Sequence, residues 1–228
     1  MVQLIPPVFP DYLIFDFDST FITGELLEEF ARITLRNHPN SWEHLAEINE
    51  LTHAGMEGKI PFDESLSRRM RLLEGSKQDV QEVTEVLKKQ ITPSIERNKK
   101  FIHNNAQNIF ILSGGFKEII VPVVSEYGIL DEHIFANDFI YDSDDAIIKV
   151  DPKNIMATGK GKVAQAKVLN FSGDVHVIGD GFTDYQVKSE GPETSFFAYI
   201  ENVKRNNVCD VADIILNNFD DYISYLMD

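Results

Sequence analysis

Two aspartates and a threonine form a D-x-D-x-T motif at residues 16–20 of this 228-residue chain. The apolar run before them, residues 12–15, is typical of a strand buried on both faces of a parallel sheet. Carboxylates at the end of such a strand repel each other unless a cation lies between them, and Mg²⁺ prefers these hard oxygen ligands. Asp16 and Asp18 therefore indicate a cation site, although a solvated acidic turn would have the same composition.

Two more polar clusters follow apolar runs. Residues 113–115, Ser-Gly-Gly, precede an expected helix, so a hydroxyl and free backbone N–H groups could hold a phosphate there. Residues 179–184, Gly-Asp-Gly-Phe-Thr-Asp, add two carboxylates. Each cluster alone is also typical of an ordinary strand-to-helix turn. Because ligands bind at the carboxyl ends of parallel strands, the three clusters together predict one site for a phosphate and a metal.

A phosphate also needs a nearby positive charge. Lys160 and Lys162, in the Thr-Gly-Lys-Gly-Lys stretch of residues 158–162, are the candidates. We assign this role to Lys160, with Lys162 as the alternative two residues further on. An exposed lysine at the start of a helix would look the same in the sequence.

The order of apolar patterns predicts the elements that position these clusters. Strand-like runs alternate with helical segments from residue 94 onward, which is typical of a mostly parallel sheet covered by helices on both faces. Residues 25–91 instead show apolar residues at helical spacing only. We therefore predict a doubly wound, Rossmann-like α/β core of residues 1–24 and 94–228, with a helical cap domain inserted at residues 25–93.

Composition excludes several classes of function. The 21 Lys and Arg residues against 37 Asp and Glu residues give a net charge of −16, which disfavours nucleic acid and anionic membranes as partners. The single cysteine, Cys209, cannot form an internal disulfide, and no apolar run is long enough to span a bilayer. The first ten residues lack the basic residues of a signal peptide. A cytoplasmic location is the expectation.

In this order the motifs resemble those of the haloacid dehalogenase-like hydrolases, and within them the phosphoserine phosphatase branch. The resemblance runs from about residue 12 to the C-terminus. Its most specific part is the segment 56–62, Met-Glu-Gly-Lys-Ile-Pro-Phe, followed by Arg69, which is similar to the cap signature of that branch. Glu25 stands at the expected distance after the first motif.

The resemblance implies a role for each residue of the first and last motifs. Asp16 would attack phosphorus and become an aspartyl-phosphate, while Asp18 would act as general acid and then base. Asp16, the backbone carbonyl of Asp18, and Asp180 would hold Mg²⁺. Asp184 and Thr183 would support the metal shell, although some relatives carry Asn at the position of Thr183.

The resemblance also assigns residues to the substrate. Glu25 would meet its ammonium group and Arg69 its carboxylate, and Met56 and Phe62 would shield the closed site. Ser113, Gly114 and Lys160 would bind the phosphoryl oxygens.

We therefore expect a Mg²⁺-dependent phosphatase that converts O-phosphoserine to serine and phosphate, as in serine biosynthesis. Alternatives are related phosphatases or phosphotransferases that act on phosphoethanolamine, phosphocholine or a methionine-salvage enol phosphate. A receiver-like or otherwise non-catalytic phosphate-binding protein is a further alternative, which Asp18 and the cap disfavour. The expected partner is a small phosphorylated metabolite, and the chain could be a monomer or a homodimer.

Overall fold

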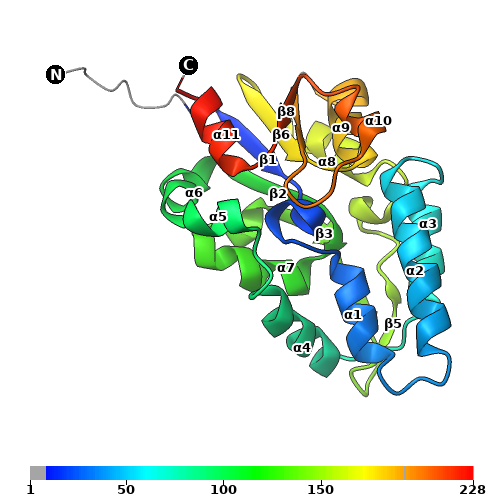
Figure 1. Ribbon diagram of the computed structural model, residues 1–228. Helices are drawn as coiled ribbons and strands as arrows, with labels where there is room; N and C mark the ends of the chain where they lie inside the picture. The colour runs from blue at the N-terminus through cyan, green and yellow to red at the C-terminus, as the bar shows by residue number, and fades with distance from the viewer. Residues whose placement is uncertain (1–8, 193, 228) are drawn as a thin grey trace.

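Six parallel strands form the central sheet, in the order β3-β2-β1-β6-β7-β8 (Figure 1). The computed structural model describes residues 9–192 and 194–227, so the first eight residues of the expected core segment 1–24 lie outside the described residues. The strands are β1 (Tyr12–Phe15), β2 (Ile109–Phe116), β3 (Ile134–Asn137), β6 (Val175–Gly179), β7 (Ser195–Tyr199) and β8 (Ile214–Leu216). The predicted doubly wound α/β core is confirmed.

Both faces of this sheet are buried, which explains the continuous apolar runs in its strands. In β1, Leu13 and Phe15 belong to one apolar cluster and Ile14 to the cluster on the opposite face. The first face is covered by α5 (Pro93–Arg97), α6 (Lys99–Asn105), α7 (Lys117–Val124) and α11 (Phe219–Tyr225). The other face is covered by α8 (Gly161–Leu169), α9 (Phe182–Glu190) and α10 (Asn206–Cys209).

Four helices lie within residues 26–87, in the part of the chain where the sequence predicts a cap (Figure 1). They are α1 (Leu26–Thr34), α2 (Ser41–Met56), α3 (Phe62–Met70) and α4 (Lys77–Leu87). Phe30 of α1 and Val83 of α4 are fully buried in the apolar cluster that continues into the sheet. Within the described residues, these and the other helices are too short or too polar to cross a membrane.

A hairpin of β4 (Phe139–Tyr141) and β5 (Ile147–Val150) extends from the core toward the start of α4. Its strands are antiparallel and turn between residues 142 and 145, where the Asp142 carboxylate accepts hydrogen bonds from the N–H groups of Asp144 and Ala146. The Gly75 carbonyl accepts a 2.7 Å hydrogen bond from the N–H of Ile147. The hairpin thereby attaches the base of α4 to the core.

The second strand is longer than the sequence suggests. We expected it to end at Leu112 and to be followed by a turn, but β2 continues to Phe116. The pairing register with β3 shifts between Leu112 and Phe116, so the three residues between them form a bulged strand end. Asn137 supports this bulge by donating a 2.8 Å hydrogen bond to the Gly114 carbonyl.

Candidate active site

Asp16 and Asp18 lie at the carboxyl end of β1, where a tight turn, η1 (Phe17–Phe21), redirects the chain. Asp16 is buried, and its Oδ1 accepts a 2.7 Å hydrogen bond from the N–H of Phe17. Asp18 is also buried, and its Oδ1 accepts a 2.6 Å hydrogen bond from the N–H of Leu26. Burial raises the pKa of Asp18 well above its ordinary value, and the nearby charges of Glu25 and Asp16 raise it further.

Lys162 joins the first and last acidic motifs. Its Nζ lies 2.7 Å from Oδ1 of Asp16 and 2.7 Å from Oδ1 of Asp184, and its side chain is only 8% exposed. Burial lowers the pKa of this ammonium group, but the two carboxylates outweigh burial and raise it overall. A fixed positive charge at this point can accept the negative oxygens of a phosphoryl group.

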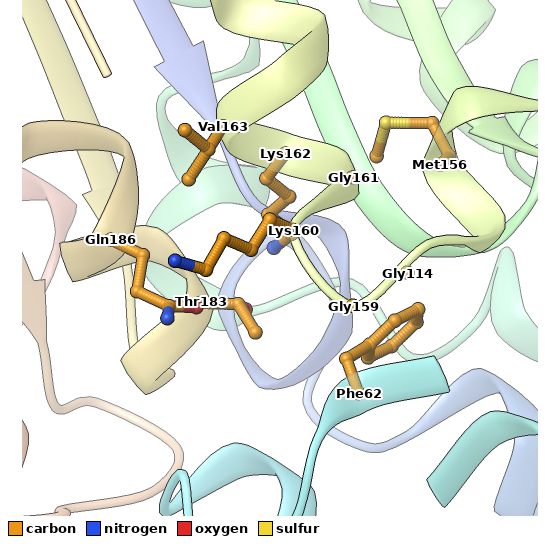
Figure 2. Close-up of a pocket in the computed structure, with 10 residues that line it drawn as sticks. All are labelled: Phe62, Gly114, Met156, Gly159, Lys160, Gly161, Lys162, Val163, Thr183 and Gln186. Carbon is orange, nitrogen blue, oxygen red and sulfur yellow. The ribbon is translucent and has the colours of Figure 1, made fainter. Parts of the chain in front are cut away.

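The choice of Lys160 as the phosphate-binding lysine requires a correction. Lys160 is 62% exposed, and its Nζ pairs with Glu190 on the surface of α9. Figure 2 shows the side chain of Lys160 extending toward Gln186, while Lys162 lies on the inner side of the same turn. The reason is that α8 begins at Gly161, which leaves Lys160 outside the first turn and directs Lys162 toward the sheet.

Three buried aspartates can hold a metal ion. One carboxylate oxygen from each of Asp16, Asp180 and Asp184 lies within 4.8 Å of the others. Among the described residues, Oδ2 of Asp16 is buried and has no hydrogen-bond partner. A buried anionic oxygen without a partner is costly, so the donor set fits a hard divalent cation. Asp184 also accepts a 3.1 Å hydrogen bond from the N–H of Gly181, which fixes it at the first turn of α9.

Thr183 and Phe182 lie beside this cluster in α9. Thr183 lines a narrow pocket together with Gly114 and Lys162, as Figure 2 shows. Phe182 packs against the cap, because a Cβ atom on Gly58 would lie 2.7 Å from its ring. The bulk of Phe182 therefore serves the contact between core and cap.

Glu25 and Arg69 provide opposite charges on the cap side of the site. Glu25 accepts a 2.7 Å hydrogen bond from the Ser19 hydroxyl. Arg69 is buried, and among the described residues it donates two long hydrogen bonds, to the Thr52 hydroxyl at 3.3 Å and the Ser65 carbonyl at 3.4 Å. Burial lowers the pKa of Arg69, while the charge of Glu25 opposes that shift. A guanidinium has five donors, so Arg69 retains capacity to bind an acidic group.

The cap is closed against the core. A Cβ atom on Gly114 would lie 2.6 Å from the ring of Phe62, and one on Gly181 would lie 3.2 Å from the sulfur of Met56. Ser113 is fully buried, and its Oγ accepts a 2.9 Å hydrogen bond from the N–H of Gly115. In the pocket of Figure 2, which Phe62 and Lys162 help to line, the centre of a water molecule can move within only about 10 Å³, so the contact of α3 with the core leaves little space there.

Arg205 also lies in this site, although nothing in the sequence marked it as a site residue. It lies directly before α10 and is buried. Its Nη1 pairs with Oδ2 of Asp180, and its Nη2 lies 3.8 Å from Oε1 of Glu25. In the sequence it stands beside Lys204 in a polar stretch, so it resembles an ordinary surface residue.

The chain is similar to several known proteins. The family model for the haloacid dehalogenase-like hydrolases matches residues 13–187. The human phosphoserine phosphatase is 29% identical over 212 residues, covering 92% of this chain and 90% of the human protein. The chloroplastic phosphoserine phosphatase of Arabidopsis thaliana is 29% identical over 215 residues, covering 93% and 70% respectively. A solved phosphoserine phosphohydrolase-like protein from Francisella tularensis is 33% identical with a TM-score of 0.84, covering 94% of this chain and 98% of its own.

Proposed function

The chain belongs to the haloacid dehalogenase-like hydrolases, and we propose that this phosphatase hydrolyses O-phosphoserine to serine and phosphate with the help of Mg²⁺. The observation that carries the proposal is the environment of Asp16. Its Oδ1 is held by Lys162, while its Oδ2 has no protein partner within the described ranges. One oxygen is therefore oriented and the other remains available for attack on phosphorus.

The neighbouring residues support a two-step reaction. In the first step Asp16 attacks phosphorus, Asp18 gives its proton to the departing serine oxygen, and an aspartyl-phosphate forms. In the second step Asp18 takes a proton from water, which attacks phosphorus and releases phosphate from Asp16. A buried carboxyl with a raised pKa suits the first of these roles, because burial favours its protonated form.

Mg²⁺ would be held by Asp16, Asp180 and the backbone carbonyl of Asp18, with Asp184 and Thr183 as support. When bound, it would offset the charge of a dianionic phosphate entering an acidic pocket. Lys162, Ser113 and Gly114 would bind the phosphoryl oxygens. These phosphate-binding residues differ from those expected from the sequence in one position, because Lys162 takes the place of Lys160.

Arg69 and Glu25 support an amino-acid substrate. A zwitterion needs one basic and one acidic partner, and the cap supplies both beside the carboxyl of Asp18. Removing Arg69 should therefore selectively impair the hydrolysis of phosphoserine. Truncating one side of a buried charge pair costs roughly 2–5 kcal/mol, so kcat/KM of Arg69→Ala for phosphoserine should fall roughly 30- to several-thousand-fold.

The test compares phosphoserine with phosphoethanolamine, which has an ammonium group but no carboxylate. Arg69→Ala should leave kcat/KM for phosphoethanolamine nearly unchanged, while Glu25→Gln should lower kcat/KM for both. Arg68→Ala is the matched control, because Arg68 is exposed and pairs loosely with Glu64 of α3 and Glu47 of α2. An equal loss for both substrates in Arg69→Ala would make Arg69 a structural cap residue and remove the support for phosphoserine.

A further inference from the structure

Arg205 is a buried cation in direct contact with a carboxylate of the proposed metal site. Its guanidinium is 5% exposed, and the carboxylate of Asp180 that it contacts is 1% exposed. Nη1 of Arg205 also lies 3.4 Å from the Asp180 backbone carbonyl. This guanidinium therefore belongs to the interior of the site.

The two oxygens of Asp180 have different partners. Oδ1 accepts a 3.1 Å hydrogen bond from the Thr20 hydroxyl, which is neutral and leaves a lone pair free. Oδ2 pairs with the full positive charge of Arg205. A divalent cation on Asp180 would face that charge across a few ångströms of buried protein, where repulsion is strong. Arg205 and a metal therefore compete for the same carboxylate.

We infer that Arg205 serves as a built-in counter-cation, which stabilises the acidic pocket without metal and must leave Asp180 when a divalent cation binds. The inference rests on the metal site of the proposed function. Without metal, Asp180 would otherwise be a buried carboxylate lacking any cation, which is strongly unfavourable. Arg205 thus allows the chain to fold before the metal arrives, and it reduces the net affinity for the metal.

Glu25 provides the position to which Arg205 can move. Its Oε1 is 3.8 Å from Nη2 of Arg205, so a small rotation of the guanidinium exchanges one carboxylate for the other. Glu25 belongs to the linker between β1 and α1, whereas Asp180 belongs to the core. Release of Arg205 from Asp180 would therefore strengthen a contact between the core and the start of the cap.

The experiment measures Mg²⁺ binding by calorimetry and the melting temperature of the chelated protein, both without substrate. Arg205→Gln should bind Mg²⁺ at least about tenfold more tightly than the unsubstituted protein, because a close charge pair no longer opposes the ion. The same variant should melt at a lower temperature in EDTA and recover most of this loss in saturating Mg²⁺. Arg205→Lys keeps the charge and should stay closer to the unsubstituted protein in both measurements. Arg97→Gln is the control, because it removes the same charge from an exposed pair with Asp220.

Each outcome separates the inference from the proposed function. Unchanged or weaker Mg²⁺ binding by Arg205→Gln would overturn the inference and show that Arg205 only orients Asp180. If this variant folds only when Mg²⁺ is present, the inference is supported; if it does not fold even then, Arg205 has a different structural role. Absence of Mg²⁺ binding by the unsubstituted protein would instead contradict the proposed function.

Discussion

Asp18 is buried and has two acidic neighbours, Glu25 and Asp16, an environment that favours its protonated form. Asp18→Asn keeps the shape of the side chain but can neither give nor take a proton. Formation and hydrolysis of the phosphoenzyme should therefore both slow by roughly 10²–10⁴-fold, the usual contribution of general acid–base catalysis. Rapid-quench measurement of both steps checks this, and near-normal rates would eliminate the role.

The two lysines of the 158–162 turn provide a direct contrast. Lys162→Met removes the charge between Asp16 and Asp184, so kcat should fall by roughly 10²–10³-fold, as when one transition-state donor is lost. Lys160→Met removes a surface pair with Glu190 and should leave kcat within about twofold, because exposed pairs contribute little. Steady-state kinetics of both variants decides the matter. A larger loss in Lys160→Met would restore the sequence-based choice.

Some residues of the site could be predicted from the sequence, and others could not. Asp16, Asp18 and Asp180 could be predicted because each follows an apolar run that must be a buried strand, and strand ends meet at one edge of a parallel sheet. The choice of lysine depended on the first residue of α8, a boundary that composition does not define. Thr52 and Arg205 reach the site only through the packing of α2 on α3 and the path of the chain after β7.

Two linkers join the cap helices to the core, and Asn202 connects them. The linkers pair with each other, because the N–H of Thr23 donates to the Gln90 carbonyl and the N–H of Thr92 donates to the Phe21 carbonyl. The Asn202 side-chain amide lies 2.7 Å from the Thr92 hydroxyl and 3.2 Å from the Ile22 carbonyl. This single amide thus bonds to both linkers.

Asn202→Ala should therefore destabilise the whole chain. Loss of partly buried hydrogen bonds of this kind costs about 1–3 kcal/mol, which for a chain of this size lowers the melting temperature by roughly 2–12 °C. Scanning calorimetry measures the shift. Asn217→Ala, which removes an exposed contact with Asp221, is the control and should change little. Equal melting temperatures for Asn202→Ala and the unsubstituted protein would mean that the linkers hold each other without Asn202.

For the cap, the sequence predicted the helices but not how they pack. Helical spacing predicted an all-helical stretch with no strand, and α1 to α4 agree with that. Spacing cannot tell which apolar faces pack on the core and which pack on each other. In the structure, α1 and α4 contribute to the apolar cluster of the sheet. Helix α2 packs on both α3 and α1, and its Ile48 shares a separate apolar cluster with Ala31 of α1. The bounds of the cap domain, residues 25–93, therefore remain a prediction.

The charge of −16 affects the molecule as a whole through carboxylates that are partly buried. Glu28 of α1 is the clearest example. Burial, followed by the charge of Glu25, raises its pKa from an ordinary value of 4.5 to about 7. The folded chain then holds a proton on Glu28 that the unfolded chain has already released, so this group lowers the free energy of unfolding as pH rises from about 4.5 to 7.

Glu28→Gln removes this penalty. The variant should melt at a higher temperature than the unsubstituted protein at pH 8, with a smaller difference or none at pH 5, where Glu28 is protonated in the folded chain. Thermal unfolding in EDTA at both pH values tests this. Glu57→Gln is the control, because a hydrogen bond from Lys59 lowers the pKa of exposed Glu57, so its removal should give no gain at pH 8. A gain for Glu28→Gln that is equal at both pH values would exclude the ionisation of Glu28 as its cause.

The pairing of α2 with α3 has a consequence for how this architecture can change over generations. These two helices place Met56, Phe62 and Arg69 at the site, yet within the part of the chain that the structure describes they add only Leu66 to the buried residues of the main cluster. Mutations in this hairpin can reshape the contacts to the organic part of a substrate while the strands keep the phosphate chemistry intact. Under the proposed roles, a lineage could acquire a new substrate by altering residues 41–70, with the sheet and the four aspartates of the site preserved.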